Sequence, residues 1–85
     1  LLRAALALLL LGTNVARALP PSTTWFVNDG STSGDVFTSA VGNNANAGTA
    51  SAPFLTIQYA ISQSAAGDVI KVDAGVYDEW VVVSK

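Results

Sequence analysis

The spacing of apolar residues in the last third of the chain, from Pro53 to Val83, constrains the fold most strongly. Four apolar residues recur at the spacing of one face of a helix, namely Ile57, Ala60, Ile61 and Ala65. We therefore expect a helix over residues 56–66, with Thr56 as its N-cap. Gly67 is placed to end this helix in the left-handed conformation that glycine adopts readily.

Two short strands are expected after the helix, at residues 69–72 and 80–83. Side chains alternate between the two faces of a strand, so every second residue faces the core. The residues expected to face inward are Ile70, Val72, Val81 and Val83, and those expected to face outward are Val69, Lys71, Trp80 and Val82. Asp73, Ala74 and Gly75 are expected to turn the chain after the first strand.

The pairing of these two strands is left open by the pattern. They could form a hairpin around Gly75, but residues 74–79 are long for a tight hairpin and contain no Asn-Gly or Asp-Gly pair. In the alternative arrangement, the strands lie on different faces of a coil and are joined by a corner. The apolar alternation is the same in both arrangements.

The first 18 residues have the order of a secretory signal peptide. Arg3 precedes a run of only Ala and Leu from Ala4 to Leu11, and the small residues Ala16 and Ala18 stand at the two positions that a signal peptidase reads. We expect cleavage after Ala18 and a secreted protein, extracellular or at the cell surface. A buried core helix is the less favoured alternative. A membrane span needs about 20 apolar residues, and we expect none in the mature segment.

The mature segment, residues 19–85, is acidic and has no cysteine. Lys71 and Lys85 stand against six acidic residues, which leaves a net charge of −4. An acidic surface without a basic patch argues against nucleic acid and against an anionic membrane as partners. A secreted domain of this size without disulfides would have a thin core. We therefore expect the N-terminal portion of a longer protein, truncated at its C-terminus.

Three zones are expected between the cleavage position and the helix. Residues 19–23 form an extended mature N-terminus with two prolines. Residues 24–27 are β-forming and are expected to be a strand, which the turn residues Asn28, Asp29 and Gly30 end. Residues 28–55 are expected to be an ordered loop that folds over the end of a scaffold, with a brief strand at residues 36–38.

Residues capable of catalysis are few. The chain has no His and no Cys, which removes imidazole and thiolate chemistry. We expect no catalytic, cofactor-binding or metal-binding residue in this segment. One alternative is that Asp29, Asp35 and the Asn-rich stretch around Asn44 and Asn46 bind calcium from separate loops, which would make calcium a cofactor of the longer protein. Ordinary turn chemistry of these residues is the other interpretation.

Three other features are candidate sites. Residues 30–34, Gly-Ser-Thr-Ser-Gly, do not form a nucleophile elbow, because the central residue is Thr and no helix follows. Asp78 and Glu79 are adjacent and would point to opposite faces of a strand, so we expect Glu79 to form hydrogen bonds at a corner. Trp80 could stack on a sugar ring, contact a partner or pack on the outside of the scaffold.

A series of short motifs runs through the mature segment. They are Trp25-Phe26-Val27, Gly48-Thr49, P-F-x-T-I-Q-x-A-I from Pro53 to Ile61, Gly67-Asp68, Ile70 and Val72, A-G-x-Y-x-E from Ala74 to Glu79, and V-x-V from Val81 to Val83. This series resembles the N-terminal entrance of right-handed parallel β-helix proteins of the pectate-lyase-like superfamily.

The resemblance implies a mainly β fold: an N-terminal cap helix and the first coil of a right-handed parallel β-helix, present here as an incomplete solenoid. Ile57, Ala60 and Ile61 would cover the apolar cross-section of the first coil, and Phe54 would anchor the start of the helix. Terminal repeats of solenoids need such a cover because their end would otherwise meet water.

For function, the resemblance implies a secreted protein that acts on or binds extracellular polysaccharide, with any catalytic residues beyond Lys85. Such a protein could be a polysaccharide lyase or a glycoside hydrolase. The alternatives are a non-catalytic cell-surface or adhesive β-helix scaffold, and a β-helix with calcium-binding repeats. Enzymes and non-enzymes share this entrance, so the resemblance leaves open whether the protein is an enzyme.

Overall fold

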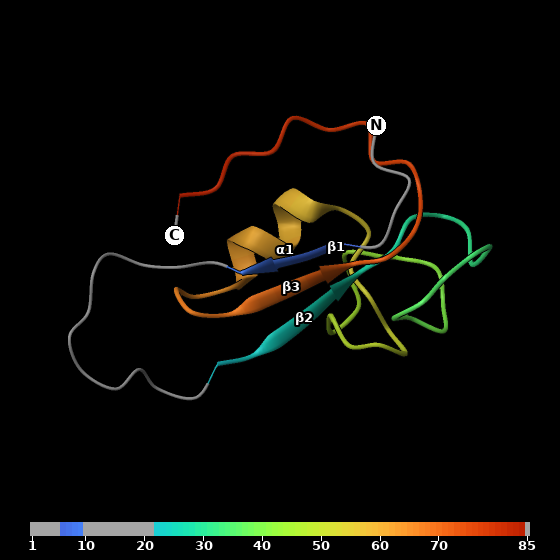
Figure 1. The fold of residues 1–85 in the computed structure, drawn as a ribbon, viewed down its shortest axis with the longest axis horizontal. Coiled ribbons are helices and arrows are strands. Elements are labelled where there is room, and N and C mark those ends of the chain that lie inside the picture. Colours follow the sequence, from blue (N-terminus) through green and yellow to red (C-terminus); the bar gives the residue numbers. More distant parts are fainter. Residues whose placement is uncertain (1–5, 10–21, 85) are drawn as a thin grey trace.

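The computed structural model of the chain describes residues 6–9 and 22–84, and Figure 1 shows their arrangement. The regular elements in chain order are the strands β1 (Leu6–Leu9) and β2 (Thr24–Val27), the helix α1 (Ile57–Gln63) and the strand β3 (Val69–Val72). The strands form one sheet in the order β1-β3-β2. The described part is therefore mainly β, with a parallel pair of strands at its centre and little helix.

The parallel pair joins two strands that are far apart in the sequence. β2 and β3 run parallel with Trp25 opposite Ile70 and Val27 opposite Val72. A parallel connection needs a long crossover, which the loop of residues 28–55 and helix α1 provide. In Figure 1, this loop gathers at the carboxyl ends of β2 and β3.

The two edges of this pair are covered differently. The loop bonds to the outer edge of β2, because Phe54 N–H donates to the Phe26 carbonyl and Asn28 N–H donates to the Phe54 carbonyl, both at 2.9 Å. The outer edge of β3 pairs with β1 in the antiparallel direction, with Leu6 opposite Val72 and Leu9 opposite Val69.

Helix α1 packs against β2 and β3 and buries one face. Ile57, Ala60 and Ile61 are its buried residues, as the apolar spacing predicts. Thr56 is the N-cap, and its side chain accepts from Tyr59 N–H. The buried apolar residues that form the core are Val27, Phe54, Ile57, Ala60, Ile61, Ile70, Val72 and Tyr77.

The carboxyl end of α1 differs from the expected one. The helix ends at Gln63 rather than residue 66, because Ser64 leaves the helical conformation and satisfies the last carbonyls itself. Its hydroxyl donates to the Ile61 carbonyl at 2.8 Å. Ala65 is consequently exposed outside the helix, and Gly67, with φ of 93°, lies in the turn before β3.

Two of the four strands that the sequence predicts are formed. β2 and β3 have the expected bounds, and β3 alternates as expected between buried and half-buried residues. Residues 80–83 do not form a strand, and residues 36–38 do not either. Val81 and Val83, expected to face inward, are exposed because no strand lies beside them. Neither the hairpin nor the corner between two strands is therefore formed.

Three aromatic rings pack beside the core. The Trp25 and Phe54 rings are stacked with centroids 5.7 Å apart, and the Tyr59 ring meets Phe54 edge-on at 4.9 Å. Gly48 lies directly against these rings, since a Cβ there would stand 2.6 Å from the Phe54 ring, and its φ is 84°. Only glycine fits this position without displacing an aromatic ring.

The expected signal peptide lies mostly outside the described residues. Arg3 and the cleavage position at Ala18 both fall there, while the middle of the apolar run is strand β1. No helix among residues 6–9 and 22–84 has the length and apolar character needed to cross a membrane.

Candidate functional site

The most densely bonded side chain of the described part is Asp73, directly after β3. Its carboxylate accepts from the backbone N–H groups of Val36, Phe37 and Thr38 at 2.7, 2.9 and 2.7 Å. The Thr38 hydroxyl donates to it at 2.6 Å, and Ala74 N–H donates at 2.8 Å. Asp73 therefore fixes the loop over the carboxyl end of the sheet, and this replaces the brief strand expected at residues 36–38.

The electrostatics of Asp73 follow from these bonds. The side chain is fully buried, with 0% exposure. Burial by itself raises the pKa of a carboxyl group. The hydrogen bonds from the Thr38 hydroxyl and from the N–H groups of Val36, Ala74 and Thr38 outweigh burial and lower the pKa of Asp73 to about 2. The group is therefore an anion at every pH at which the protein would work.

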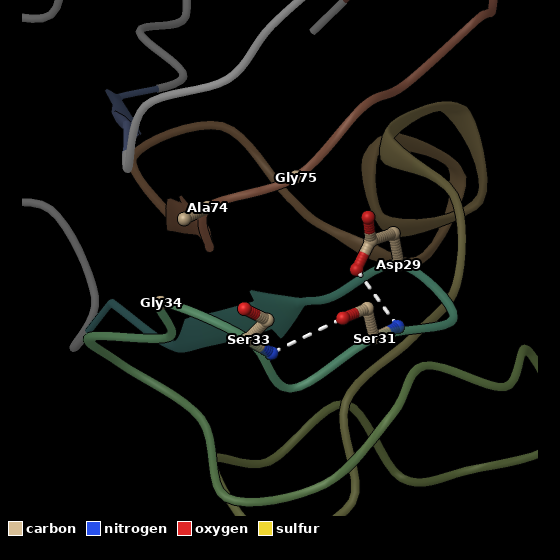
Figure 2. Close-up of a pocket in the computed structure, with 6 residues that line it drawn as sticks. All are labelled: Asp29, Ser31, Ser33, Gly34, Ala74 and Gly75. Carbon is tan, nitrogen blue, oxygen red and sulfur yellow. Dashed lines mark hydrogen bonds between the residues drawn. The ribbon is translucent and has the colours of Figure 1, made fainter.

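A polar hollow of about 410 Å³ opens beside this anchor. Figure 2 shows its lining, which comes from the turn after β2 and the turn after β3: Asp29, Ser31, Ser33, Gly34, Ala74 and Gly75. Asp29 Oδ1 accepts from Ser31 N–H at 3.0 Å, and Ser31 Oγ accepts from Ser33 N–H at 3.1 Å. These bonds shape the loop wall of the hollow.

Asp29 also joins the two walls of the hollow. Its Oδ2 accepts from Val76 N–H at 3.2 Å. Gly75 permits this approach, because a Cβ at that position would overlap the same oxygen. The glycine of the A-G-x-Y-x-E motif is thus explained by close contact with a carboxylate.

Asp35 and Asn28 form a second polar pair. Asn28 is fully buried, and its amide donates to Asp35 Oδ2 at 2.6 Å and to the Ala40 carbonyl at 2.8 Å. Asp35 Oδ1 is buried and has no hydrogen-bond partner within the described residues. Asp35 itself is only partly buried.

Tyr77 closes the core beneath these acids. Its hydroxyl donates to the Asp73 backbone carbonyl at 3.0 Å. Burial raises the pKa of Tyr77 far above its ordinary value, and the negative charges of Asp29, Asp73 and Asp35 raise it further. The phenol therefore acts as a permanent hydrogen-bond donor and not as a base.

Glu79 binds the amino end of helix α1. Its two oxygens accept from Ile57 N–H and Gln58 N–H, both at 2.9 Å. The first N–H groups of a helix have no partner within the helix, and a negative charge at this end is favourable. Glu79 therefore forms hydrogen bonds, as expected from the sequence, but at the amino end of α1 and not at a corner between two strands.

Gln58 holds the segment that follows Glu79. Its side-chain amide donates to the Val82 carbonyl at 3.1 Å, and its oxygen accepts from Val82 N–H at 2.7 Å. One glutamine side chain thus makes the pair of bonds that a neighbouring strand would make. Figure 1 shows the segment running past α1.

Asp68 binds N–H groups at the other end of the sheet, as Asp73 does at the carboxyl end. Its carboxylate accepts from Thr23 N–H, the Trp25 indole N–H and Ala65 N–H, each at 2.9 Å. The bonds from Thr23, Trp25 and Ala65 lower the pKa of Asp68 and outweigh the effect of its burial. Asp68 thereby ties the start of β2 to the turn before β3.

Two Asn side chains tie the Asn-rich stretch to the residues before α1. Asn44 Oδ1 accepts from Leu55 N–H at 2.8 Å and Thr56 N–H at 3.2 Å, and the Asn46 amide donates to the Pro53 carbonyl at 2.9 Å. Among residues 6–9 and 22–84, no three Asp, Glu, His or Cys side chains meet where they could hold a metal ion. The Asn44 and Asn46 side chains thus hold the loop against the backbone of residues 53–56.

The remaining sequence candidates lie on the surface. Asp78 is exposed, and Trp80 is 92% exposed on the segment past α1. Ser31 and Ser33 line the polar hollow through turn hydrogen bonds, and no helix follows them. These residues do not form a nucleophile and base pair.

The chemistry of the site is therefore the binding of backbone N–H groups by carboxylates. Asp29, Asp68, Asp73 and Glu79 all accept from backbone N–H groups of distant segments. Sequence reasoning missed Asp68 and Asp73 in this role, and it missed the pair of bonds that Gln58 makes with Val82. The available signal was position, because each Asp stands directly at one end of the β3 strand.

The comparisons with known proteins bear on the same region. Residues 40–81 match a family model described as "Protein of unknown function (DUF1565)". This domain is associated with right-handed β-helix proteins. The matched range contains α1, β3, Asp73, Gln58 and Glu79. No curated protein and no solved structure matches the chain.

Proposed function

We propose that the chain forms the N-terminal closing end of a secreted right-handed parallel β-helix, and that the protein binds or acts on extracellular polysaccharide. The family match over residues 40–81 supports the β-helix part of this proposal. The observation that carries the closing role is the parallel pair β2 and β3 with α1 packed against it. The two strands of such a pair lie side by side in the parallel direction, as strands of successive coils do in a solenoid.

Helix α1 supports this role through its position. Its apolar face, Ile57, Ala60 and Ile61, is buried against the core, while Glu79 binds its amino end. A solenoid end that is left open exposes apolar side chains to water. A helix held at one end by a carboxylate and along one face by the core is suited to cover that end.

A polysaccharide as the partner is supported by the resemblance to the pectate-lyase-like superfamily and by the exposure of Trp80. Exposed aromatic rings offer flat apolar surfaces with defined geometry. The mature segment carries a net charge of −4, so we expect a neutral polymer to be preferred over an anionic one at low ionic strength.

Affinity electrophoresis tests the polysaccharide proposal. The chain is run through gels that contain neutral galactan, polygalacturonate or no polymer, beside the Trp80→Ala variant. Trp80 is almost fully exposed, so its removal costs little stability. We expect galactan to slow the wild-type chain more than the variant. A wild-type chain that migrates at the same rate with and without either polymer would contradict a polysaccharide partner.

A non-catalytic surface or adhesive β-helix is the second candidate. It is favoured by the use of Asp29, Asp68, Asp73 and Glu79 as acceptors for backbone N–H groups. A carboxylate that holds the backbone in place is not free to exchange a proton with a substrate. We therefore expect no release of sugar products from either polymer by this chain, and measurable release would place catalysis within it.

A further inference from the structure

The polar hollow beside Asp73 contains hydrogen-bonding groups that no described residue uses. The Ser33 N–H donates to Ser31 Oγ at 3.1 Å, but the Ser33 hydroxyl bonds to nothing among residues 6–9 and 22–84. The Ser31 hydroxyl accepts that bond and donates its own proton to no described residue. A hydroxyl group is both a donor and an acceptor. Two O–H donors on the loop side of the hollow are therefore available to a ligand.

Asp29 supplies acceptors next to these hydroxyls. Each of its carboxylate oxygens accepts one backbone N–H, from Ser31 at Oδ1 and from Val76 at Oδ2. An ionised carboxylate has about four lone-pair sites, so each oxygen can accept a further hydrogen bond. The two bonds already present fix the direction of the carboxylate. The hollow thus combines two O–H donors with one fixed carboxylate acceptor, as Figure 2 shows.

Small residues form the opposite wall and leave room for a ligand. Ala74 and Gly75 line this wall, and Figure 2 shows them across the hollow from Ser31 and Ser33. The volume of about 410 Å³ falls within the range of about 300–1,000 Å³ that is typical of small-molecule sites. One unit of a polysaccharide fits such a space.

The charge of the hollow selects against an anion. The residues that line it include Asp29 and no basic residue. Asp29, Asp73 and Asp35 together raise the pKa of Tyr77, which shows that negative charge gathers on this side of the sheet. A ligand with a carboxylate or phosphate group would be repelled. A metal ion would lack ligands, because no three acidic side chains meet within the described part of the chain. A neutral ligand with several hydroxyl groups suits the hollow best.

Both walls are held in place without a ligand. The Asp73 carboxylate binds the N–H groups of residues 36–38, and Asp29 bonds across the hollow to Val76 N–H. A ligand therefore does not have to order the loop, which removes part of the entropic cost of binding. The two turns that line the hollow follow β2 and β3, so the parallel pairing of these strands also brings the two walls together.

We propose that this hollow binds one neutral sugar unit through two adjacent hydroxyl groups. The inference rests on the proposed polysaccharide partner and assigns the place where a unit of that polymer is held. The two sugar hydroxyls donate to the Asp29 carboxylate, and the Ser31 and Ser33 hydroxyls donate to sugar oxygens. Sugar hydroxyls act as donors and acceptors, so one sugar unit uses both kinds of group. The bonds to Asp29 are the stronger ones, because their acceptor is ionised.

The probe is galactobiose, a neutral disaccharide, added to the full chain while amide chemical shifts are followed by nuclear magnetic resonance. We expect the shifts to concentrate on residues 30–34 and 74–76. Fully O-methylated galactobiose is the matched ligand control, since its ether oxygens accept hydrogen bonds but donate none. It should bind at least about 10-fold more weakly, because the bonds to Asp29 are lost. Equal binding of the two sugars, or shifts confined to other residues, overturns the proposal.

Two substitutions test the assigned contacts. Ser33→Ala removes a ligand contact and no hydrogen bond between described residues, and we expect it to weaken galactobiose binding about 5-fold. Its matched control is Ser39→Ala, because Ser39 is exposed in the same loop and does not line the hollow. Asp29→Asn should weaken binding at least about 10-fold. Affinities of Ser33→Ala and Asp29→Asn equal to that of Ser39→Ala would overturn the assignment.

The outcomes separate this site from the polysaccharide proposal on which it rests. If galactan slows the chain in gels but galactobiose shifts only amides around Trp80, the hollow is not the sugar site and the polysaccharide partner stands. If galactobiose shifts the amides of the hollow but galactan does not slow the chain, the sugar site stands and the polymer does not. The absence of any shift with galactobiose overturns the site.

Discussion

Replacing Asp73 by Asn should weaken the fold by an amount that the structure allows us to work out. Asp73 is fully buried and its carboxylate accepts five hydrogen bonds, three of them from the backbone of residues 36–38. A carboxyl group whose pKa falls from 3.8 to about 2 on folding stabilises the protein by about 2 kcal/mol at neutral pH. The Asn amide also points an N–H₂ group toward N–H donors. The polar groups left unsatisfied lower the stability by about 1 kcal/mol more.

The pH dependence follows from the sign of the same shift. The folded pKa of Asp73 lies below the unfolded value, so the stabilisation is complete above about pH 4. It is lost as the pH falls from about 4 to 2, because the unfolded chain then binds a proton that the folded chain does not. We expect the wild-type chain to lose stability over this range and Asp73→Asn to lose less.

Urea unfolding of the full chain, followed by tryptophan fluorescence between pH 2 and 7, measures both effects. Asp78→Asn is the matched control, since Asp78 is exposed and its replacement removes the same charge. The control should change stability by less than about 0.5 kcal/mol. An Asp73→Asn chain as stable as the control, with an unchanged acid profile, would refute the assigned role of Asp73.

Three further substitutions test other contacts by the same unfolding assay. Ile61→Asp buries a charge beneath α1 and should cost at least about 3 kcal/mol, whereas Gln63→Asp on the exposed side should cost little. Glu79→Gln should lower stability by about 1 kcal/mol and speed amide exchange at the start of α1; unchanged exchange would show that the carboxylate is not needed there. Gly75→Ala should cost about 1 kcal/mol by pushing the Asp29 carboxylate off Val76 N–H, and a neutral result would count against that contact.

Tyr59 is not suited as a control position for the Ile61 substitution. The spacing of apolar residues places Tyr59 on the outer side of the helix, but its ring packs edge-on against Phe54 and is only partly exposed. A charge at Tyr59 would disturb the aromatic cluster. Gln63 lies on the exposed side and is the better matched position.

Elements with a strong local signal could be predicted from the sequence. Strands β2 and β3 carry runs of β-forming residues between turn residues, and α1 carries its apolar face and a Thr cap. Each of these signals acts over a few residues. The helix end was wrong by three residues because Ser64 satisfied the last carbonyls earlier than Gly67 could.

Residues 80–83 show where local signals fail. Trp80 and the three valines after it have high β propensity, yet they form no strand and stay exposed. A strand exists only when another strand pairs with it. In the described structure the neighbour of Val82 is the Gln58 side chain, which bonds to one residue and cannot extend a ladder.

The partners of the site residues could not be predicted for a related reason. Asp73 bonds to residues 35 to 37 positions earlier in the chain, and Glu79 bonds to residues 21 and 22 positions earlier. Nothing in the local sequence indicates such distant partners. Glu79 forms hydrogen bonds, as expected, but it bonds to the first N–H groups of α1 and not at a corner between two strands.

The stacking of β2 on β3 in the parallel direction is the central claim, and nuclear Overhauser contacts in the full chain test it most directly. Parallel strands bring amide and Hα protons of neighbouring strands together, whereas antiparallel strands bring pairs of Hα protons together. We predict amide-to-Hα contacts between the two strands around Trp25 with Ile70 and Val27 with Val72. Hα-to-Hα contacts between the strands, or no contact between them, would contradict the parallel stacking and with it the proposed closing end of a β-helix.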